Sequence, residues 1–323
     1  MTIFTQPCVT EGPRAWNHAH LAMQRLHSAS VERKHTLTED PEKADIVLIS
    51  NIPPDDHQAA LRHHPVVQRH INKAFQVSEA WDQPRLLAGM HVNATKGLNF
   101  RRFRTGSYAL HHPDFKNPLC EGHNPEIAKP IKPDLLASFM GRDCHSSRKA
   151  LFNVRFKRKD VLIKDTSDYK AFTHQQEGKE IGQTDYYNTC RRSKFVLCPR
   201  GVGASSIRLF ESLRLGIAPV IISDAWLPCV GPAWTSGAII VKERNIPEIE
   251  RILEEHEPRY AELGYAARRI HDQFFSDGVY FNYLITNLLA IQQERPLPER
   301  LFSISWSAQI VIRRSRNRLQ GLA

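Results

Sequence analysis

Two hydrophobic patterns alternate along the chain, and together they predict an α/β protein. Short unbroken apolar runs are typical of strands that are buried on both faces of a parallel sheet. Such runs lie at residues 44–50, 85–91, 135–141, 160–164, 194–198, 220–222 and 238–241. Stretches with apolar residues at helical spacing separate them, at residues 16–26, 57–75, 145–152, 185–192 and 247–274. Strands that alternate with helices favour doubly wound, mostly parallel sheets.

Chain length and one proline-rich stretch predict two domains. A chain of 323 residues is comfortable for two domains of about 150 residues each. Residues 111–132 are rich in proline and polar side chains and lack periodicity, which indicates a linker. We therefore expect an N-terminal domain over residues 1–132 and a C-terminal domain over 133–290. Residues 291–323 are expected to form a tail or a helix that packs back on the first domain.

The most informative stretch, residues 193–228, predicts a strand, a glycine loop, a helix and a second strand. Gly201 and Gly203 can take positive φ or let a ligand approach the backbone. Ser206 can cap the helix that follows, and Gly216 suits its left-handed end. At 100° per residue the apolar face of this helix is expected to meet the sheet. Its other face, with Arg208, Glu211 and Ser212, is expected to be exposed.

The glycine loop and the start of the helix together predict an anion site. Free N–H groups at a helix N-terminus attract phosphate. Arg200 precedes the first glycine and Arg208 lies in the first helical turn, so both can pair with a diphosphate. Glu211, one turn further, can accept hydrogen bonds from sugar hydroxyls. The alternative is that Arg208 and Glu211 form a solvated ion pair on a surface helix.

This stretch resembles the exostosin-type glycosyltransferases. That family carries Cys-Pro-Arg-Gly after a strand, Ser-x-Arg-x-x-Glu on a helix, then Gly-x-x-Pro-Val-Ile and Leu-Pro. These motifs occur here at residues 198–201, 206–211, 216–221 and 227–228. The resemblance implies a GT-B fold, with two Rossmann-like domains facing a cleft and transfer with inversion at the anomeric carbon. It also implies that the C-terminal domain holds a nucleotide-diphosphate sugar, and the donor-binding residues are expected to be Arg200, Gly201, Gly203, Ser206, Arg208 and Glu211.

Composition indicates a soluble globular protein. The chain is 41% hydrophobic and 24% charged, and no stretch approaches eighteen uninterrupted apolar residues. The first residues lack a signal-peptide pattern, and the six cysteines show no C-x-x-C spacing, which suits a reducing compartment. Animal and plant members of the family normally carry an N-terminal membrane anchor, and this sequence departs from them. We therefore expect a cytoplasmic bacterial enzyme of surface polysaccharide assembly.

The net charge of +10 leaves three kinds of partner open: a polyanion, an anionic membrane face, or an acidic acceptor glycan. Nucleic acid is not expected, because the basic residues are dispersed and no recognition motif is present. Residues 99–104 interleave aromatic and basic side chains. This pattern favours a solvated edge strand over a binding site for a phosphorylated or acidic acceptor. Arginines at 313, 314, 316 and 318 allow either peripheral contact with the inner membrane face or a solvated tail.

The chemistry of sugar transfer indicates which groups the site must contain. The chain contains no Asp-x-Asp pair, so we expect neither a metal nor a cofactor, with a UDP-sugar as co-substrate. Arginines and a helix terminus must then stabilise the leaving diphosphate. Inversion also needs a general base, which should come from the first domain. Asp56 and His91 follow two of its predicted strands and are the candidates.

Two other functions stay open. Residues 201–206 partly match the G-x-G-x-x-G pattern of NAD(P)-dependent oxidoreductases, and Asp224 lies at a suitable distance, but the third glycine is missing. A non-catalytic glycan- or polyanion-binding protein with a transferase-like fold would keep the basic surface without binding a nucleotide sugar.

Overall fold

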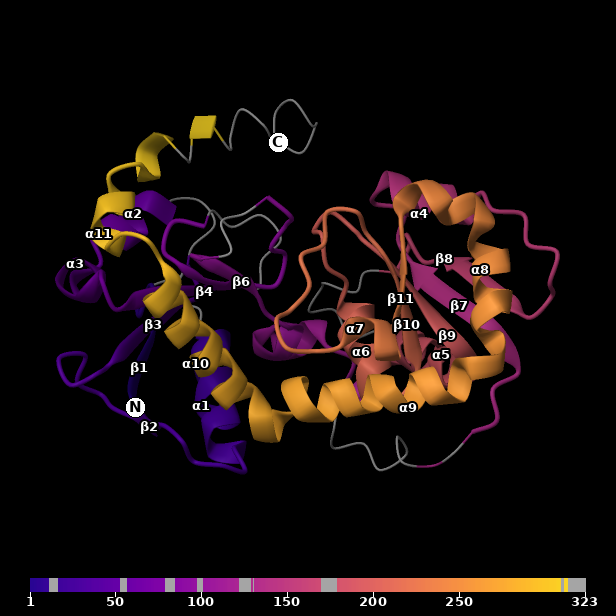
Figure 1. Ribbon diagram of the computed structural model, residues 1–323, viewed down its shortest axis with the longest axis horizontal. Coiled ribbons are helices and arrows are strands. Elements are labelled where there is room, and N and C mark those ends of the chain that lie inside the picture. The colour runs from indigo at the N-terminus through magenta and orange to yellow at the C-terminus, as the bar shows by residue number, and fades with distance from the viewer. Residues whose placement is uncertain are drawn as a thin grey trace. The chain divides into compact units, whose positions relative to one another are not determined.

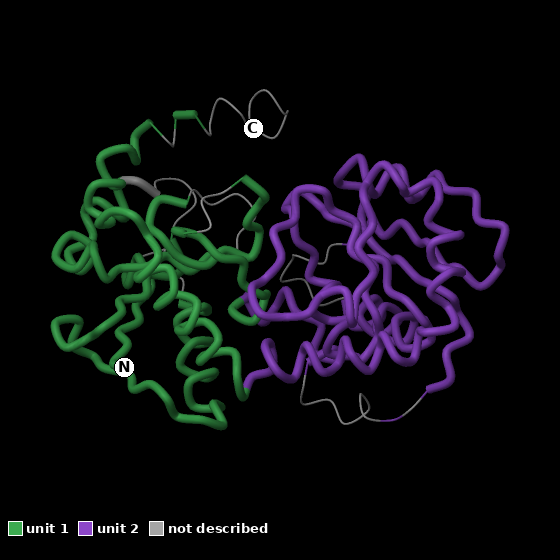
Figure 2. Tube along the Cα trace, viewed as in Figure 1, with its two compact units in different colours: residues 1–110, 278–323 green, residues 111–277 purple. Residues whose placement is uncertain are grey.

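The computed structural model comprises two compact units (Figures 1 and 2). Unit 1 contains residues 1–110 and 278–323, and unit 2 contains residues 111–277. The residues that the structure describes are 1–11, 17–52, 57–78, 85–97, 101–121, 129, 131–169, 179–308 and 311–312.

Unit 1 is built on a six-stranded parallel sheet with the order β2-β1-β3-β4-β5-β6. Its strands are β1 (Thr2–Pro7), β2 (Thr36–Leu37), β3 (Ile46–Ser50), β4 (Ala74–Ser78), β5 (Gly89–His91) and β6 (Phe103–Thr105). Its helices are α1 (His18–Ala29), α2 (His57–Arg62), α3 (Pro65–His70), the 3₁₀ turn η1 (Tyr108–Leu110), α10 (Asp277–Glu294) and α11 (Glu299–Ser303). Every residue of β3 and β4 is buried, as expected for central parallel strands.

Two expectations for unit 1 are corrected. The helix expected over residues 57–75 is divided, because Pro65 begins the separate helix α3 and residues 74–78 form the strand β4. Apolar residues in short runs satisfy helical and strand spacing equally well, so only pairing with β3 decides between them. The strands β1 and β2 lie in a part of the chain where no strand was expected.

Unit 2 is built on a five-stranded parallel sheet with the order β11-β10-β9-β7-β8. Its strands are β7 (Leu135–Gly141), β8 (Val161–Asp165), β9 (Ser193–Pro199), β10 (Ala218–Ile222) and β11 (Ile239–Val241). Its α-helices are α4 (Ser146–Phe152), α5 (Lys179–Arg191), α6 (Ile207–Leu215), α7 (Trp234–Gly237), α8 (Ile249–His256) and α9 (Tyr260–Ile270). Single 3₁₀ or π turns lie at Pro113–Phe115, Pro118–Cys120, Glu243–Glu248, Glu257–Arg259 and His271–Phe275.

Each unit is therefore a Rossmann-like α/β domain with a parallel sheet, and this confirms the predicted fold class. In unit 2 the strand-loop-helix-strand order of residues 193–228 is also as expected. Gly216 ends α6 with φ 72°, and its N–H bonds back to Leu213 and Ser212. Apolar residues of all five strands, including Phe139, Phe195 and Val220, form the core of this unit.

The boundary between the units differs from the expected position at residues 132/133, because unit 2 begins at His111. Residues 111–121 pack on helices of unit 2: Asn117 Nδ2 donates to the Gln183 carbonyl at 2.9 Å, and Glu121 pairs with Arg214 at 2.7 Å. A proline-rich stretch without periodicity does not reveal which of the two domains it packs against. At the other end the chain returns to unit 1 at Gly278, and not at 291 as expected.

The chain after Gly278 is an integral part of unit 1. In Figure 1 α10 runs beside α1, and the Phe281 ring meets His27 edge-on at 5.0 Å. The Tyr280 hydroxyl accepts the backbone N–H of Ser107 at 3.0 Å. Trp306, near the described end of the chain, is 1% exposed and donates to the Leu86 carbonyl at 3.1 Å.

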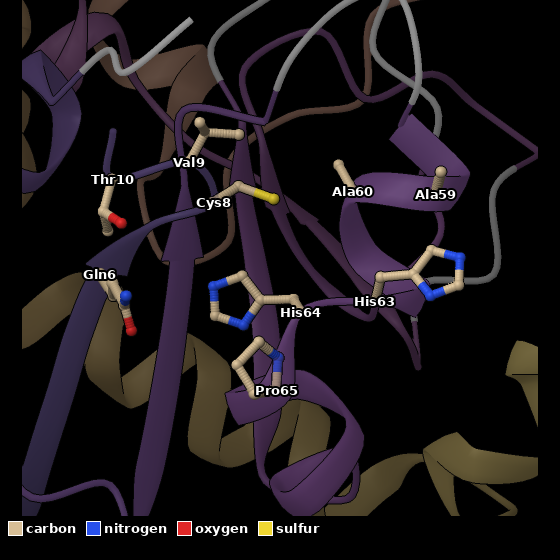
Figure 3. A pocket seen from close by; sticks show the side chains of 9 residues that line it. All are labelled: Gln6, Cys8, Val9, Thr10, Ala59, Ala60, His63, His64 and Pro65. Atoms are coloured by element: carbon tan, nitrogen blue, oxygen red, sulfur yellow. The ribbon is translucent and has the colours of Figure 1, made fainter. Parts of the chain in front are cut away.

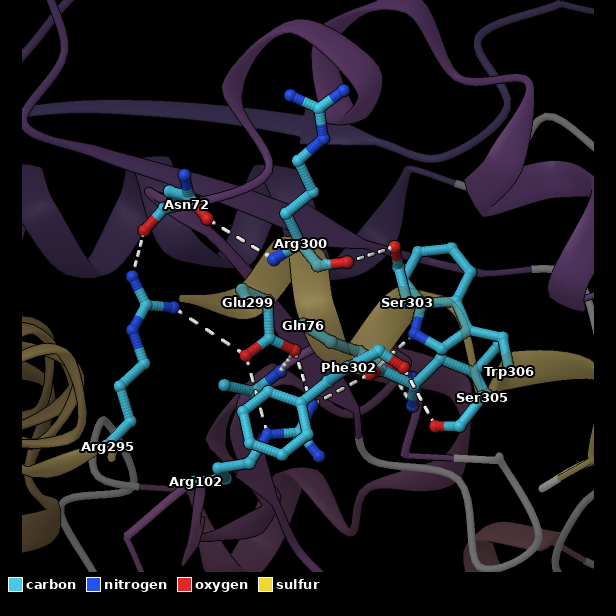
Figure 4. Close-up of polar contacts among 12 residues, drawn as sticks. Asn72, Gln76, Arg102, Arg295, Glu299, Arg300, Phe302, Ser303, Ser305 and Trp306 are labelled. Carbon is cyan, nitrogen blue, oxygen red and sulfur yellow. Dashed lines mark hydrogen bonds and ion pairs between the residues drawn. The ribbon is translucent and has the colours of Figure 1, made fainter. Parts of the chain in front are cut away.

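A buried ion pair fixes α11 to the sheet of unit 1 (Figure 4). The Glu299 carboxylate is fully buried and contacts the guanidinium of Arg102, while its Oε1 accepts the N–H of Ala88 at 2.9 Å. The Arg102 guanidinium lies 3.9 Å from the centre of the Phe302 ring. The strand β6 lies at the edge of the sheet, as expected for residues 99–104. The expectation that this strand is solvated is wrong for Arg102 and Arg104, which are buried. Their partner carboxylates lie about 190 residues away in sequence, where no local pattern shows them.

Among the described residues, no helix combines the length and the apolar character that crossing a bilayer requires.

Candidate functional site

The sheet of unit 2 has a topological switch point between β7 and β9. From β7 the chain moves to β8 on one side, and then returns to β9 on the other. Open α/β sheets bind ligands in the crevice outside the carboxyl ends of the strands at such a point. The loops that border it here are residues 142–145 after β7 and residues 200–206 after β9. The predicted donor site therefore lies where this topology places a ligand site.

Arg148, on α4, ties these two loops together. Its Nε donates to the Arg200 carbonyl at 3.0 Å, and its Nη1 donates to the Arg142 carbonyl at 3.1 Å. The side chain is 7% exposed. A Cβ on Gly201 would lie 3.1 Å from Arg148 Nη2, so glycine is the residue that lets the loop approach the guanidinium. No local sequence pattern indicates Arg148, because only the fold brings α4 beside the glycine loop.

Arg200 folds back on its own loop. Its backbone N–H donates to the Ile222 carbonyl at 3.0 Å, and its Nε and Nη2 donate to the carbonyls of Gly201 and Val202 at 3.3 and 3.2 Å. These bonds hold the loop across the ends of β9 and β10. Arg200 thus shapes the predicted site and brings a positive charge to its edge.

The start of α6 offers unused donors. Ser206 occupies the N-cap position but makes no side-chain capping bond, and its buried Oγ has no hydrogen-bond partner among the described residues. The first N–H groups of a helix need such partners. A buried hydroxyl and an uncapped helix start are a suitable pair for an anionic ligand.

Arg208 points its guanidinium at the end of β7. Its Nε donates to the Met140 carbonyl at 2.8 Å, and the guanidinium carbon lies 5.3 Å from the Phe139 ring centre and 5.8 Å from that of Tyr186. Within the described part of the chain, neither Nη atom has a hydrogen-bond partner. A Cβ on Gly141 would lie 3.0 Å from Nη2. The Nη donors are therefore fixed in direction at the switch point.

Glu211 is held by Tyr186 of α5, whose hydroxyl donates to Glu211 Oε2 at 2.7 Å. Burial raises the pKa of Glu211, and the Tyr186 hydrogen bond and the nearby Arg208 charge oppose this shift. No ion pair joins Arg208 to Glu211, so the interpretation as a solvated surface pair is wrong. The expected exposed face is also wrong for Ser212, which is buried and donates to the Ile217 carbonyl at 2.7 Å.

Uncharged thiols surround this part of α6. Burial raises the pKa of Cys190 to about 12, and it also raises the pKa of Cys198 and of Cys120. The pKa of the Tyr186 phenol lies well above its ordinary value for the same reason. Glu211 therefore sits in a buried environment in which the thiols and the phenol are uncharged and Arg208 is the charge nearest to it in effect, and a hydrogen bond from a ligand hydroxyl is stronger there than in water.

Of the two candidate bases of the first domain, the structure describes only His91. Asp56 lies outside the described residues. His91 is the last residue of β5, at the carboxyl edge of the sheet as expected, but it is only 2% exposed and packs edge-on against Phe103 at 5.6 Å. An acceptor hydroxyl could reach its ring only after a rearrangement.

Unit 1 has its own switch point, at β1, and a pocket of ≈ 270 Å³ opens beside it (Figure 3). The lining residues come from the end of β1 and from α2 and the turn after it: Gln6, Cys8, Val9, Thr10, Ala59, Ala60, His63, His64 and Pro65. Burial raises the pKa of the Cys8 thiol to about 12 and lowers the pKa of His64, so both are uncharged at neutral pH. This lining suits a neutral ligand that carries hydroxyls.

The solved structures to which the chain is similar include two glycosyltransferases. A glycosyltransferase from Rickettsia africae aligns over 91% of this chain and 99% of its own, with a TM-score of 0.42 and 10% identity. WaaG, a glycosyltransferase involved in lipopolysaccharide biosynthesis, aligns over 92% and 100%, with a TM-score of 0.36 and 10% identity.

Curated relatives are more similar in sequence but match over shorter stretches. The exostosin-1 homolog of Caenorhabditis elegans is 33% identical over 122 residues, which cover 35% of this chain and 31% of the relative. Exostosin-1 of Drosophila melanogaster is 30% identical over 186 residues, or 51% of this chain and 24% of the relative. A probable beta-1,4-xylosyltransferase of Arabidopsis thaliana, IRX10, is 38% identical over 72 residues, or 22% and 18%. The chain thus spans less than a third of the length of these relatives.

The family model of the exostosin GT47 domain matches residues 55–256. This range is more than half of the chain, and it includes the whole strand-loop-helix-strand segment around Arg200, Arg208 and Glu211. The chain therefore belongs to the exostosin GT47 family.

Proposed function

We propose that this protein is a glycosyltransferase that moves a sugar from a nucleotide-diphosphate donor, a UDP-sugar, to a glycan acceptor. The reaction is inverting and needs no metal. The observation that carries the proposal is the position of Arg208, whose two Nη groups have no hydrogen-bond partner among the described residues and lie at the switch point of unit 2. The Ser206 hydroxyl and the uncapped start of α6 extend the same set of donors.

These groups supply what the leaving diphosphate needs. As the glycosidic bond of the donor breaks, negative charge grows on the diphosphate oxygens, and fixed donors stabilise it. Arg208 is held by the Met140 carbonyl and two aromatic rings, so little reorganisation accompanies the reaction. Arg148 and Gly201 keep the loop in the shape that leaves the helix start open.

Glu211 is assigned to the hydroxyl groups of the donor. Its Oε2 is bonded to Tyr186, which leaves Oε1 for a ribose or sugar hydroxyl. In buried surroundings such a bond contributes more than it would in water. The pocket of unit 1 is then a place for sugar residues of the acceptor.

The cellular setting is also a proposal: assembly of a bacterial surface polysaccharide, on the cytoplasmic side and in peripheral contact with the inner membrane. Four apolar side chains near the C-terminus support the membrane contact, because Leu301, Ile304, Val311 and Ile312 are 51%, 77%, 63% and 55% exposed. The sequence continues with arginines at 313, 314, 316 and 318, and basic residues beside an apolar surface favour anionic lipid.

A binding and product assay tests the function. UDP-, GDP- and TDP-sugars and NAD are titrated separately by calorimetry, and the donor that binds is then incubated with oligosaccharide acceptors and analysed by mass spectrometry. We expect binding of a nucleotide-diphosphate sugar and a product one sugar longer. Binding of NAD alone would support an oxidoreductase, and binding of glycans without any nucleotide sugar would support a non-catalytic protein.

A further inference from the structure

Tyr186, on α5, contacts two charged residues of α6 at the proposed donor site. Its hydroxyl donates to Glu211 Oε2 at 2.7 Å, and the centre of its ring lies 5.8 Å from the guanidinium carbon of Arg208. The helices α5 and α6 come directly before and after β9 in the chain. The geometry of these three residues is therefore set entirely within unit 2.

The hydrogen bond between Tyr186 and Glu211 has a definite direction. An ionised carboxyl group has no hydrogen to give, so the phenol donates and Oε2 accepts. Burial holds the pKa of the Tyr186 phenol well above its ordinary value, so the hydroxyl keeps this hydrogen at neutral pH. One oxygen of the Glu211 carboxylate is thus occupied.

The other oxygen, Oε1, remains for a ligand. It has no hydrogen-bond or ion-pair partner among the described residues, and it is not one of their buried polar atoms without a partner. The side chain of Glu211 is partly exposed. A hydroxyl group of a ligand can therefore donate to Oε1 while Tyr186 donates to Oε2.

Tyr186 also limits the freedom of both side chains on α6. A glutamate side chain has several rotatable bonds, and fixing it costs conformational entropy. The Tyr186 hydrogen bond holds the carboxylate before a ligand arrives, so Oε1 has a set direction. The rings of Tyr186 and Phe139 both lie within 6 Å of the Arg208 guanidinium, at 5.8 and 5.3 Å, and such contacts are attractive for a cation.

We propose that Tyr186 is a positioning residue that makes the donor site selective for a diphosphate carrying a ribose or sugar over inorganic pyrophosphate. Its hydroxyl directs Glu211 Oε1 at a hydroxyl group of the ligand, and its ring supports the Arg208 guanidinium that meets the diphosphate. Inorganic pyrophosphate has no sugar hydroxyl to give to Oε1. This assignment rests on the proposed function and adds to it the residue that decides which diphosphates bind tightly.

The charge on Glu211 depends on Tyr186 as well. Burial raises the pKa of the Glu211 carboxyl, whereas the Tyr186 hydrogen bond and the Arg208 charge lower it. The other titratable or charged groups that act on Glu211 come from the segment before β7, from α5, from β9 and from α6 itself: Cys120, Glu121, Cys190, Cys198 and Arg214. Burial keeps the three thiols uncharged, and Glu121 and Arg214 pair with each other at 2.7 Å. Loss of the phenol hydroxyl should therefore raise the pKa of Glu211 further.

Tyr187 provides a matched control for Tyr186. It is the next residue of α5 and points about 100° further around the helix. Its hydroxyl accepts from Arg191 Nη1 at 3.2 Å. Tyr187→Phe thus removes a phenol hydroxyl from the same helix turn without touching the Glu211 carboxylate.

Calorimetry with UDP and with inorganic pyrophosphate tests the selectivity. Tyr186→Phe should weaken UDP binding by about tenfold, because Glu211 loses a hydrogen bond to its charged group. Its affinity for pyrophosphate should stay within about twofold, because the ring beside Arg208 remains. Tyr186→Leu also lacks the ring and should weaken pyrophosphate binding by about threefold and UDP binding by more than tenfold. Tyr187→Phe should keep both affinities within about twofold.

Two further readouts separate positioning from a loss of packing. The affinity for UDP should fall as the Glu211 carboxyl takes up its proton, and in Tyr186→Phe this fall should begin at a higher pH than in the wild type. Glu211→Ala has no carboxyl to titrate, so the pH dependence that it retains belongs to UDP itself and is subtracted. In the Glu211→Ala background, Tyr186→Phe should change the affinity for UDP by less than twofold, because the hydroxyl acts through the carboxylate.

Three results would overturn the assignment: wild-type affinity for UDP in Tyr186→Phe, equal losses for UDP and pyrophosphate, or a full tenfold loss in the Glu211→Ala background. If Tyr186→Phe does not fold, Tyr186→Leu gives the same test, because both variants should lower the affinity for UDP relative to that for pyrophosphate. A failure of the proposed function appears in the wild type, which would then bind no nucleotide diphosphate, and this result refutes both proposals. If the wild type binds UDP and transfers sugar while Tyr186→Phe binds UDP equally well, the function stands and the role of Tyr186 is wrong.

Discussion

Arg208 on α6 and Met140 on β7 are joined by a hydrogen bond of 2.8 Å from Nε to the backbone carbonyl. The two residues are 68 positions apart in sequence, and their contact fixes the guanidinium at the end of the strand that borders the switch point. This carbonyl bonds to Nε alone, and both Nη atoms therefore remain available to a ligand. The proposed donor site thus depends on a backbone carbonyl, which any residue type at position 140 would supply.

Replacing Arg208 by alanine should weaken UDP binding by about 30-fold or more. Losing one partner of a buried charge pair costs about 2–5 kcal/mol. Isothermal titration calorimetry measures the change, and Arg251→Ala, which removes an exposed arginine on α8, is the matched control. Wild-type affinity in a folded Arg208→Ala protein would contradict the assignment.

Replacing Glu211 by glutamine should change how stability depends on pH. The pKa of Glu211 in the folded state is raised above its unfolded value near 4.5. At a pH between these two values, the carboxyl keeps its proton in the folded state and has lost it in the unfolded state. Stability from this group is therefore present below about pH 4.5 and is lost as pH rises through the folded pKa. Urea unfolding at pH 4 and pH 7 should show a smaller loss of stability for Glu211→Gln than for the wild type. Glu254→Gln, an exposed position on α8, should behave as the wild type does.

The same Glu211→Gln variant should bind UDP more weakly and inorganic pyrophosphate about as well as the wild type. The expected difference follows from its position, one helical turn beyond the diphosphate donors and bonded to Tyr186. Equal loss of affinity for both ligands, measured by calorimetry, would show that Glu211 acts on the diphosphate or on the fold.

Replacing Glu299 by glutamine should destabilise unit 1 by about 3–5 kcal/mol, because it leaves the buried Arg102 without a charged partner. Denaturant unfolding measures the loss, and Glu262→Gln, which breaks an exposed pair, should cost far less. A loss below about 1 kcal/mol would mean that the ion pair in Figure 4 is not what holds α11 in place.

Sugar transfer should persist in EDTA, because Arg208 and the start of α6 are proposed to stabilise the diphosphate. Product formation is measured by mass spectrometry before and after dialysis against the chelator. Complete loss of activity that manganese or magnesium restores would refute the metal-independent mechanism.

The sequence by itself determined the parallel α/β class and the strand-loop-helix-strand segment that is proposed to hold the donor. Buried parallel strands require continuous apolar runs such as residues 135–141 and 218–222, and a helix between them requires an end such as Gly216. These requirements are local, so they appear in consecutive residues. The motif spacing that led to the exostosin family is local for the same reason.

The tertiary structure alone decided which residues meet. Arg148 reaches the glycine loop from 52 positions away, and Glu299 meets Arg102 across 197 positions. Asn51, which follows β3, accepts the backbone N–H of His20 at the start of α1, across 31 positions. Such contacts follow from the order of strands in a sheet, and sequence periodicity carries no information on that order. The return of the chain to unit 1 as α11 also gave Arg102 a buried carboxylate as its partner, where its local pattern indicated solvent.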